Sequence, residues 1–81
     1  MSFGVLWFPQ PRKYIEKLPK DIAARILDKV RVVLLDPFRY VERFEGEFYK
    51  LRIGEYRALV DIDFQQKIVR IRVFDKRERI Y

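Results

Sequence analysis

The 81-residue chain contains no histidine, cysteine, asparagine or threonine, and Ser2 is its only serine. Without histidine and cysteine, the sequence excludes a Ser-His-Asp triad and a Cys-His nucleophile pair. Without cysteine it also lacks the disulfide framework that is typical of small secreted domains. Asparagine and cysteine are scarce in hyperthermophile proteins, which are rich in charge, so the composition favours a thermophilic source.

Long apolar runs and glycine-rich loops are missing as well. No run approaches the roughly 20 apolar residues that cross a bilayer, and no basic segment followed by an apolar core marks a signal peptide. The three glycines stand alone in the sequence, which argues against a phosphate-binding loop. We therefore expect a cytoplasmic protein that has no contact with a membrane.

Positive charge is plentiful. Eighteen Lys and Arg residues stand against twelve Asp and Glu residues, so the formal net charge is +6. Residues 67–81 hold six basic and two acidic side chains, which account for +4 of that excess. Such a charge distribution indicates either a solvated charged surface or a site for a polyanion.

Hydrophobic periodicity and four prolines divide the chain into elements. The predicted order is a strand over residues 2–8, a short helix over 11–18, an amphipathic helix between Pro19 and Pro37, a polar connection over 38–47, strands over 48–53, 56–63 and 67–74, and a charged tail over 75–81. We therefore predict a single domain over residues 1–81, of the α+β class. In this small two-layer fold, β-α-α-β-β-β, a helix hairpin covers one face of a four-stranded, mainly antiparallel sheet.

The predicted strands have two chemically different faces. Side chains alternate between the faces of a strand, so Lys50 and Arg52 share one face, and Arg70 and Arg72 repeat the pattern. We expect this cationic face to be open. The helices are expected to cover the other face, which carries Leu51, Ile53, Val60, Ile62, Val69, Ile71 and Val73.

Two acidic residues interrupt the basic pattern. Asp61 and Asp63 share a strand face, and their two carboxylates could hold Mg²⁺. We expect instead that they offset Arg57 and Lys67 across the strands.

The remaining chemistry-bearing side chains are Lys, Arg and Tyr, which suffice in principle for RNA cleavage. Arg binds phosphate through two hydrogen bonds and stabilises developing negative charge. Neighbouring cations disfavour an ammonium ion and favour a phenolate, so a Lys or a Tyr in a basic cluster can exchange protons. Lys50, packed among Arg52, Arg57 and Arg77, is the candidate base, and Tyr81 could stack on a nucleobase or join the proton transfer.

The order of the residues carries a family resemblance. The relevant segments are Tyr49-Lys50-Leu51-Arg52, Gly54-Glu55-Tyr56-Arg57 and Lys76-Arg77-Glu78-Arg79-Ile80-Tyr81, together with Leu18-Pro19-Lys20 and Leu35-Asp36-Pro37 around the amphipathic helix. This ordered set resembles the RelE branch of the RelE/ParE toxin superfamily over nearly the whole chain.

The resemblance implies a type II toxin that inhibits translation by cleaving messenger RNA in the ribosomal A site. The reaction would proceed by 2′-hydroxyl attack, without a metal ion or other cofactor, and a RelB-like antitoxin would neutralise the toxin. Carried over by position, Lys50 is the base, Arg52 and Arg57 hold the phosphate, Arg77 assists the leaving oxygen and Tyr81 stacks on the nucleotide, with the roles of Lys50 and Tyr81 open to exchange. Further RNA contacts are expected from Arg70, Arg72, Lys76 and Arg79.

Two departures and two alternatives stand beside this hypothesis. Many relatives carry His where this chain has Lys76, and some continue beyond the position of Tyr81. A ParE-like inhibitor of DNA gyrase would have the same fold without catalysis. A plain nucleic-acid-binding module would need only a basic strand face with aromatic residues.

Overall fold

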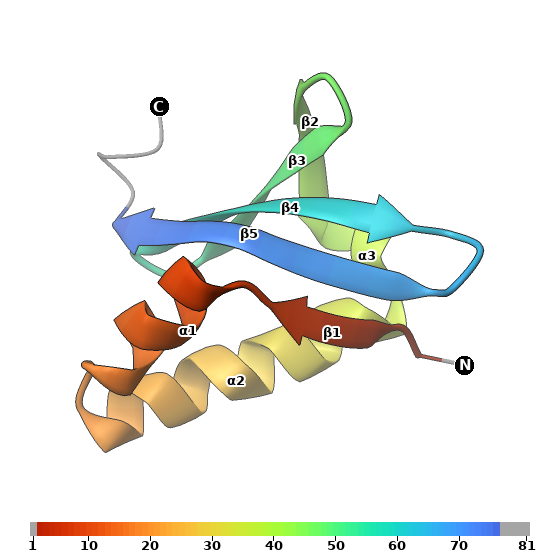
Figure 1. The fold of residues 1–81 in the computed structure, drawn as a ribbon. Helices are drawn as coiled ribbons and strands as arrows, with labels where there is room; N and C mark the ends of the chain where they lie inside the picture. Colours follow the sequence, from red (N-terminus) through yellow and green to blue (C-terminus); the bar gives the residue numbers. More distant parts are fainter. Residues whose placement is uncertain (1, 77–81) are drawn as a thin grey trace.

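The computed structural model describes residues 2–76 (Figure 1). Its elements, in chain order, are β1 (Gly4–Trp7), α1 (Pro9–Glu16), α2 (Lys20–Leu35), α3 (Pro37–Tyr40), β2 (Val41–Glu45), β3 (Phe48–Ile53), β4 (Tyr56–Asp63) and β5 (Ile68–Lys76). The predicted α+β class and the helix hairpin are confirmed. The observed α1 begins and ends two residues before the predicted helix, and β5 runs two residues beyond the predicted strand.

The five strands form one sheet in the order β1-β5-β4-β3-β2. Strand β1 runs parallel to β5, and every other neighbouring pair is antiparallel. The fold therefore has one strand more than the four that we predict from the sequence. The additional strand, β2, lies at the sheet edge and follows the single-turn helix α3. Its sequence, VERFE, is almost entirely exposed, so it lacks the apolar alternation that indicates a strand.

Helices α1 and α2 lie together on one side of the sheet, as Figure 1 shows. The 3.6-residue period of α2 directs Ile26, Val30 and Val33 into the core, where they join buried residues of β3, β4 and β5. A proline flanks each end of α2: Pro19 is the N-cap residue before it, and Pro37 follows the C-cap residue Asp36. The largest fully buried side chains on the strands are Phe74, Leu51 and Ile71. Among residues 2–76, no helix combines the length and apolarity that crossing a bilayer demands.

A bulge in β5 changes which side chains face the helices. Leu59 pairs with Val73 and Val60 pairs with Ile71, so Arg72 is an extra residue on the β5 side. An extra residue reverses the alternation of the side chains that follow it. Val73 is consequently 38% exposed whereas Phe74 is fully buried. The expectation that Val73 belongs to the core is therefore wrong.

Candidate nucleic-acid interface

The open face, which is the side of the sheet opposite the helices, brings three predicted site residues together. Strand β3 contributes Lys50 and Arg52, and β4 contributes Arg57. These three residues line one small hollow of about 60 Å³ together with Tyr40 and Glu42. Lys50, Arg52 and Arg57, which the sequence assigns to one site from two separate strands, therefore lie on one surface.

The two arginines in this hollow lie directly opposite each other. Arg52 pairs with Arg57 in the antiparallel register of β3 and β4. Like charges at directly opposite positions destabilise a sheet, so folding alone gives no reason for this pair. Arg52 is exposed, whereas Arg57 is only 7% exposed. The hollow thus combines a buried and an accessible guanidinium, an arrangement suited to gripping an anion such as phosphate.

Next to the hollow, the β4–β5 half of the open face holds a network of ion pairs. Asp61 accepts hydrogen bonds of 2.8 Å from Nη1 of Arg70 and from Nη1 of Arg72. Asp63 accepts a bond of 3.0 Å from Nη2 of Arg70. The two acids therefore form ion pairs with Arg70 and Arg72, which the sequence-based expectation of Arg57 and Lys67 as their partners did not include.

The network depends on register. Asp61 lies opposite Arg70 across β4 and β5, and the bulge keeps Arg72 within reach of the same carboxylate. The backbone N–H of Gln66, followed by the Arg70 guanidinium, holds the pKa of Asp63 below its usual value. Hydrogen bonding to Asp61 and then to Asp63 raises the pKa of Arg70. Positive charge is therefore unevenly distributed on the open face, because Asp61 and Asp63 offset the charges of Arg70 and Arg72 on β5.

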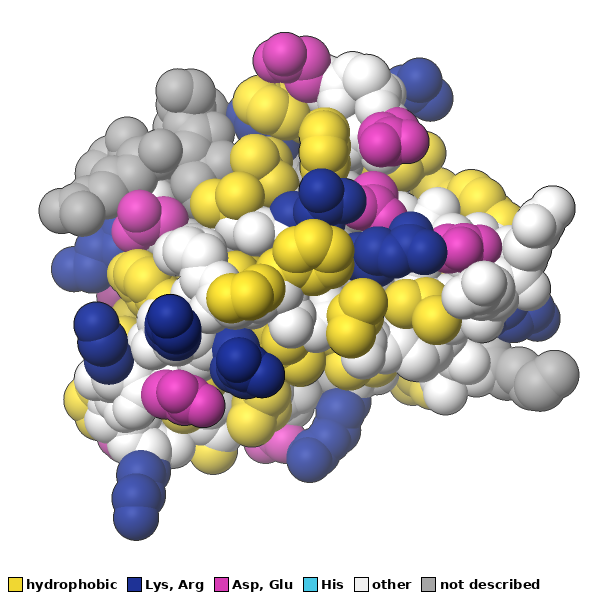
Figure 2. Space-filling view, viewed as in Figure 1, with side chains coloured by type: hydrophobic (Ala, Val, Ile, Leu, Met, Phe, Trp, Pro, Cys, Tyr) yellow, Lys and Arg dark blue, Asp and Glu magenta, His cyan; other side chains and the backbone are white. Residues whose placement is uncertain are grey.

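Aromatic rings accompany the cations of the open face. The guanidinium carbon of Arg72 lies 4.4 Å from the ring centroid of Phe8 and 5.5 Å from that of Phe48. The Nζ atom of Lys50 lies 4.7 Å from the ring centroid of Phe44. Figure 2 shows hydrophobic side chains interleaved with Lys and Arg side chains from β5 toward the β2–β3 hairpin, with acidic side chains beside them.

These rings are not among the predicted site residues, although the sequence contains a signal for them. Phe44 and Phe48 flank Gly46, which adopts a positive φ of 56° in the turn between β2 and β3. An aromatic residue on each side of a glycine turn indicates a hairpin whose strands carry neighbouring rings.

The C-terminal part of the predicted site is only partly described. Lys76 is exposed at the end of β5, opposite Tyr56 of β4. Arg77, Arg79 and Tyr81 lie outside the described residues. Within residues 2–76, no three acidic side chains gather closely enough to form a candidate metal site.

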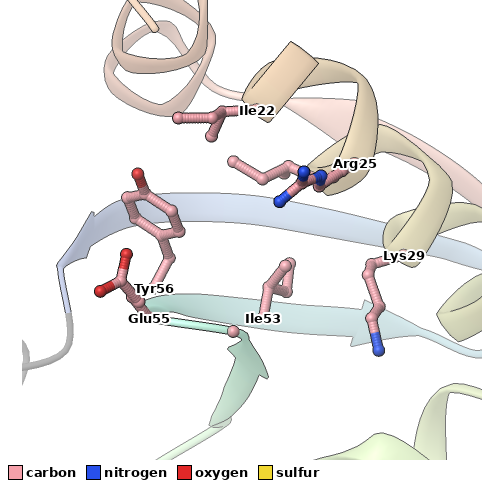
Figure 3. A pocket seen from close by; sticks show the side chains of 8 residues that line it. Ile22, Arg25, Lys29, Ile53, Glu55 and Tyr56 are labelled. Carbon is pink, nitrogen blue, oxygen red and sulfur yellow. The ribbon is translucent and has the colours of Figure 1, made fainter. Parts of the chain in front are cut away.

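A second hollow lies on the helix side of the sheet. It has a volume of about 270 Å³ and is lined by Ile22, Arg25, Ile26, Lys29, Ile53, Gly54, Glu55 and Tyr56. Figure 3 shows side chains of α2, including Ile22 and Arg25, facing Ile53 and Tyr56 across it. A further hollow shares Arg25 and Lys29 and extends to Tyr40 and Arg52. Apolar surface with a basic rim thus runs along α2 toward the cationic hollow, which is the hollow lined by Lys50, Arg52 and Arg57.

The fold and this surface define a small α+β domain with a cationic hollow on the helix-free face of its sheet. The model of the family described as ParE toxin of type II toxin-antitoxin system, parDE, matches residues 5–81. The chain therefore belongs to this toxin family, within the RelE/ParE superfamily. No curated protein sequence matches it.

Solved structures with the same fold include RelE toxins. The RelBE2 toxin-antitoxin complex of Mycobacterium tuberculosis contains a chain with a TM-score of 0.84 and 25% identity, covering 95% of this chain and 93% of that one. The archaeal RelE-RelB complex from Pyrococcus horikoshii contains a chain with a TM-score of 0.81 and 25% identity, and the match covers 98% of this chain and 99% of that one. A mutant of Escherichia coli RelE in the free state has a TM-score of 0.78 and 21% identity, and the match covers 99% of this chain and 88% of that one. The chain is thus a type II toxin with a RelE-like fold.

Proposed function

We propose that this toxin is an endoribonuclease that cleaves messenger RNA in the ribosomal A site. The observation that carries the proposal is the convergence of Lys50, Arg52 and Arg57 in one hollow of the open face. A gyrase inhibitor that acts by binding alone has no need for a candidate base beside two phosphate-gripping arginines. Cleavage of RNA needs both kinds of group.

The proposed reaction requires only the groups that this chain supplies. The RNA 2′-oxygen attacks the adjacent phosphorus while its proton passes to a base, which we assign to Lys50. The bond from phosphorus to the 5′-oxygen breaks, and that oxygen takes up a proton as it leaves. The products are a 2′,3′-cyclic phosphate and a free 5′-hydroxyl. Arg52 and Arg57 stabilise the additional negative charge on the phosphorane.

Three further roles fall on residues outside the described part of the chain and follow from the resemblance alone. Arg77 assists the leaving oxygen, Tyr81 stacks on the nucleotide or takes the place of Lys50 as base, and Arg79 contacts the RNA backbone. Lys76, Arg70 and Arg72 are proposed as further backbone contacts. The ribosome supplies the orientation of the 2′-hydroxyl for in-line attack, an entropic contribution that can be large. Free RNA is therefore expected to be a poor substrate.

A second candidate function is inhibition of DNA gyrase, which the description of the matching family as ParE toxin favours. Induced expression in bacteria separates the two. After induction, primer extension on an abundant messenger should reveal new 5′ ends at ribosome-bound codons. Intact messengers together with double-strand DNA breaks would instead establish the gyrase function. Expression of Arg57→Gln should abolish the cuts, whereas Arg31→Gln, on the exposed side of α2, should retain them.

We also propose an antitoxin partner. The structural neighbours include complexes of RelE with RelB. The apolar hollow along α2, rimmed by Arg25 and Lys29, fits an amphipathic segment that carries acids on its edges. Lys29→Glu should weaken binding of the protein encoded by the adjacent gene, whereas Lys13→Glu on α1 should not. Equal effects of the two reversals would exclude this hollow as the docking surface.

A further inference from the structure

The hairpin formed by β2 and β3 presents phenylalanine rings beside the cationic hollow. Phe44 lies on the edge strand β2 and is 40% exposed. Its ring centroid lies 4.7 Å from Nζ of Lys50, which lines the hollow. An aromatic ring therefore stands next to the amine that the proposed reaction uses as base.

A second ring on this hairpin is held by a fixed cation. Phe48 is half-buried and contacts the Arg72 guanidinium, whose carbon is 5.5 Å from the ring centroid. Arg72 is itself anchored, because its Nη1 donates a hydrogen bond of 2.8 Å to Asp61, whose side chain is only 9% exposed. The same guanidinium contacts Phe8 at 4.4 Å. Cation–π contacts of this kind restrain the rings, so they are already in place before a ligand arrives.

Two other exposed rings among residues 2–76 are arranged differently. Phe64 and Phe38 are 56% and 44% exposed, but their rings stack on each other with centroids 5.0 Å apart. This pair buries aromatic surface within the protein. Phe44 contacts a cation instead, and it does so on the surface that carries the cationic hollow.

Rings interleaved with cations match the chemistry of single-stranded nucleic acid. Nucleobases stack on aromatic side chains irrespective of sequence, while cations between the rings bind the phosphates that link the bases. An acidic protein segment would satisfy the cations but would have no flat partner for the rings. The open face therefore favours single-stranded RNA over an acidic peptide at this place.

We propose that Phe44 and Phe48 form a base-stacking subsite for single-stranded RNA, beside the phosphate held at Lys50, Arg52 and Arg57. The subsite rests on the proposed ribonuclease function, and it holds a nucleobase next to the cleaved bond irrespective of sequence. Phe44 is a binding residue that touches a base, and Arg72 is a positioning residue that acts through Phe48.

The test measures stacking without cleavage. A short RNA with 2-aminopurine at one position and 2′-deoxy sugars, which cannot be cut, is titrated with the full chain at low salt. Stacking should quench the fluorescence, and an RNA of equal length with abasic positions should bind more weakly. Phe44→Ala should weaken binding by about 5-fold to 100-fold and remove the quenching. Phe44→Tyr should preserve both, and Phe64→Ala serves as the control for loss of an exposed ring.

The outcomes separate this inference from the proposed function. Equal binding of abasic and intact RNA, with no effect of Phe44→Ala, would overturn the subsite even if the wild-type protein cuts messengers on ribosomes. Loss of antitoxin binding in Phe44→Ala with unchanged RNA quenching would overturn it in favour of a protein partner. Ring-dependent quenching by a protein that leaves ribosomal messengers intact would support the subsite and refute the ribonuclease.

Discussion

The side-chain amide of Gln10 forms two hydrogen bonds with the backbone of Phe74, 64 residues further along the chain. Its Nε2 donates to the Phe74 carbonyl oxygen, and its Oε1 accepts from the Phe74 N–H, both at 2.8 Å. Gln10 lies in the first turn of α1, and Phe74 is fully buried in β5. One side chain thus joins α1 to the end of the sheet that leads into residues 77–81.

Gln10→Ala should destabilise the protein, because it removes both bonds and leaves two backbone groups of β5 unsatisfied. We expect a loss of roughly 1–3 kcal/mol in the free energy of unfolding. For a domain of this size each kcal/mol lowers Tm by about 4–8 °C. Thermal unfolding and hydrogen exchange at the Phe74 amide measure the effect. A Tm equal to that of Gln65→Ala, in the exposed β4–β5 turn, would contradict this role.

Removing a charge from the hollow should impair cleavage far more than folding. For Arg52→Gln we expect a loss of about 10²-fold or more in ribosome-dependent cleavage, since one phosphate-binding donor disappears. Tm should be nearly unchanged, because Arg52 is exposed. Single-turnover cleavage on programmed ribosomes provides the measurement, with Arg31→Gln as the control. Wild-type rates in Arg52→Gln would place the phosphate elsewhere.

Asp61→Asn should change both stability and RNA binding. The substitution removes one carboxylate from two arginines, so the protein should unfold more easily. Arg72 becomes available to phosphate, while Arg70 keeps only its ion pair with Asp63. Binding to single-stranded RNA should tighten, and its salt dependence should become steeper. Asp28→Asn makes the same charge change at an exposed ion pair of α2. If the two variants bind RNA alike, net charge rather than the released Arg72 explains the effect.

Asp63 should contribute to acid sensitivity. Its pKa in the folded protein lies below its usual value, mainly because the Gln66 N–H donates to the carboxylate. The folded state therefore gains stability above the ordinary Asp pKa and loses that gain as pH falls through the lowered value. Urea unfolding should show that Asp63→Asn lowers the free energy of unfolding more at pH 7 than at a pH below both the ordinary and the lowered pKa of Asp63. A deficit independent of pH would contradict this linkage.

Arg77→Ala and deletion of Tyr81 test the part of the site that lies outside the described residues. Both changes should abolish toxicity while leaving antitoxin binding intact, since the resemblance assigns these residues to chemistry and stacking. Cleavage should fall by about 10²-fold or more for Arg77→Ala. Variants that melt early but still cut messenger RNA at wild-type rates would show that the tail serves folding instead.

Periodicity in the sequence was sufficient to predict the elements with a strong apolar pattern. Strands β3 and β4 have the predicted bounds, and α2 buries Ile26, Val30 and Val33 as its period indicates. The grouping of Lys50 and Arg52 on one face also follows from alternation within a strand. These are local properties, because the repeat of a helix or strand determines where successive side chains point.

Properties that depend on contacts between strands were decided only by the tertiary structure. Strand β2 forms because β3 offers it an edge, and VERFE lacks the apolar alternation that would predict a strand. The bulge at Arg72 removes Val73 from the core and brings Arg72 to Asp61, which already lies opposite Arg70. The approach of Phe44 to Lys50 depends on the same hairpin register. A single-residue shift in pairing exchanges the two faces of a strand, and one sequence read alone carries no record of that pairing.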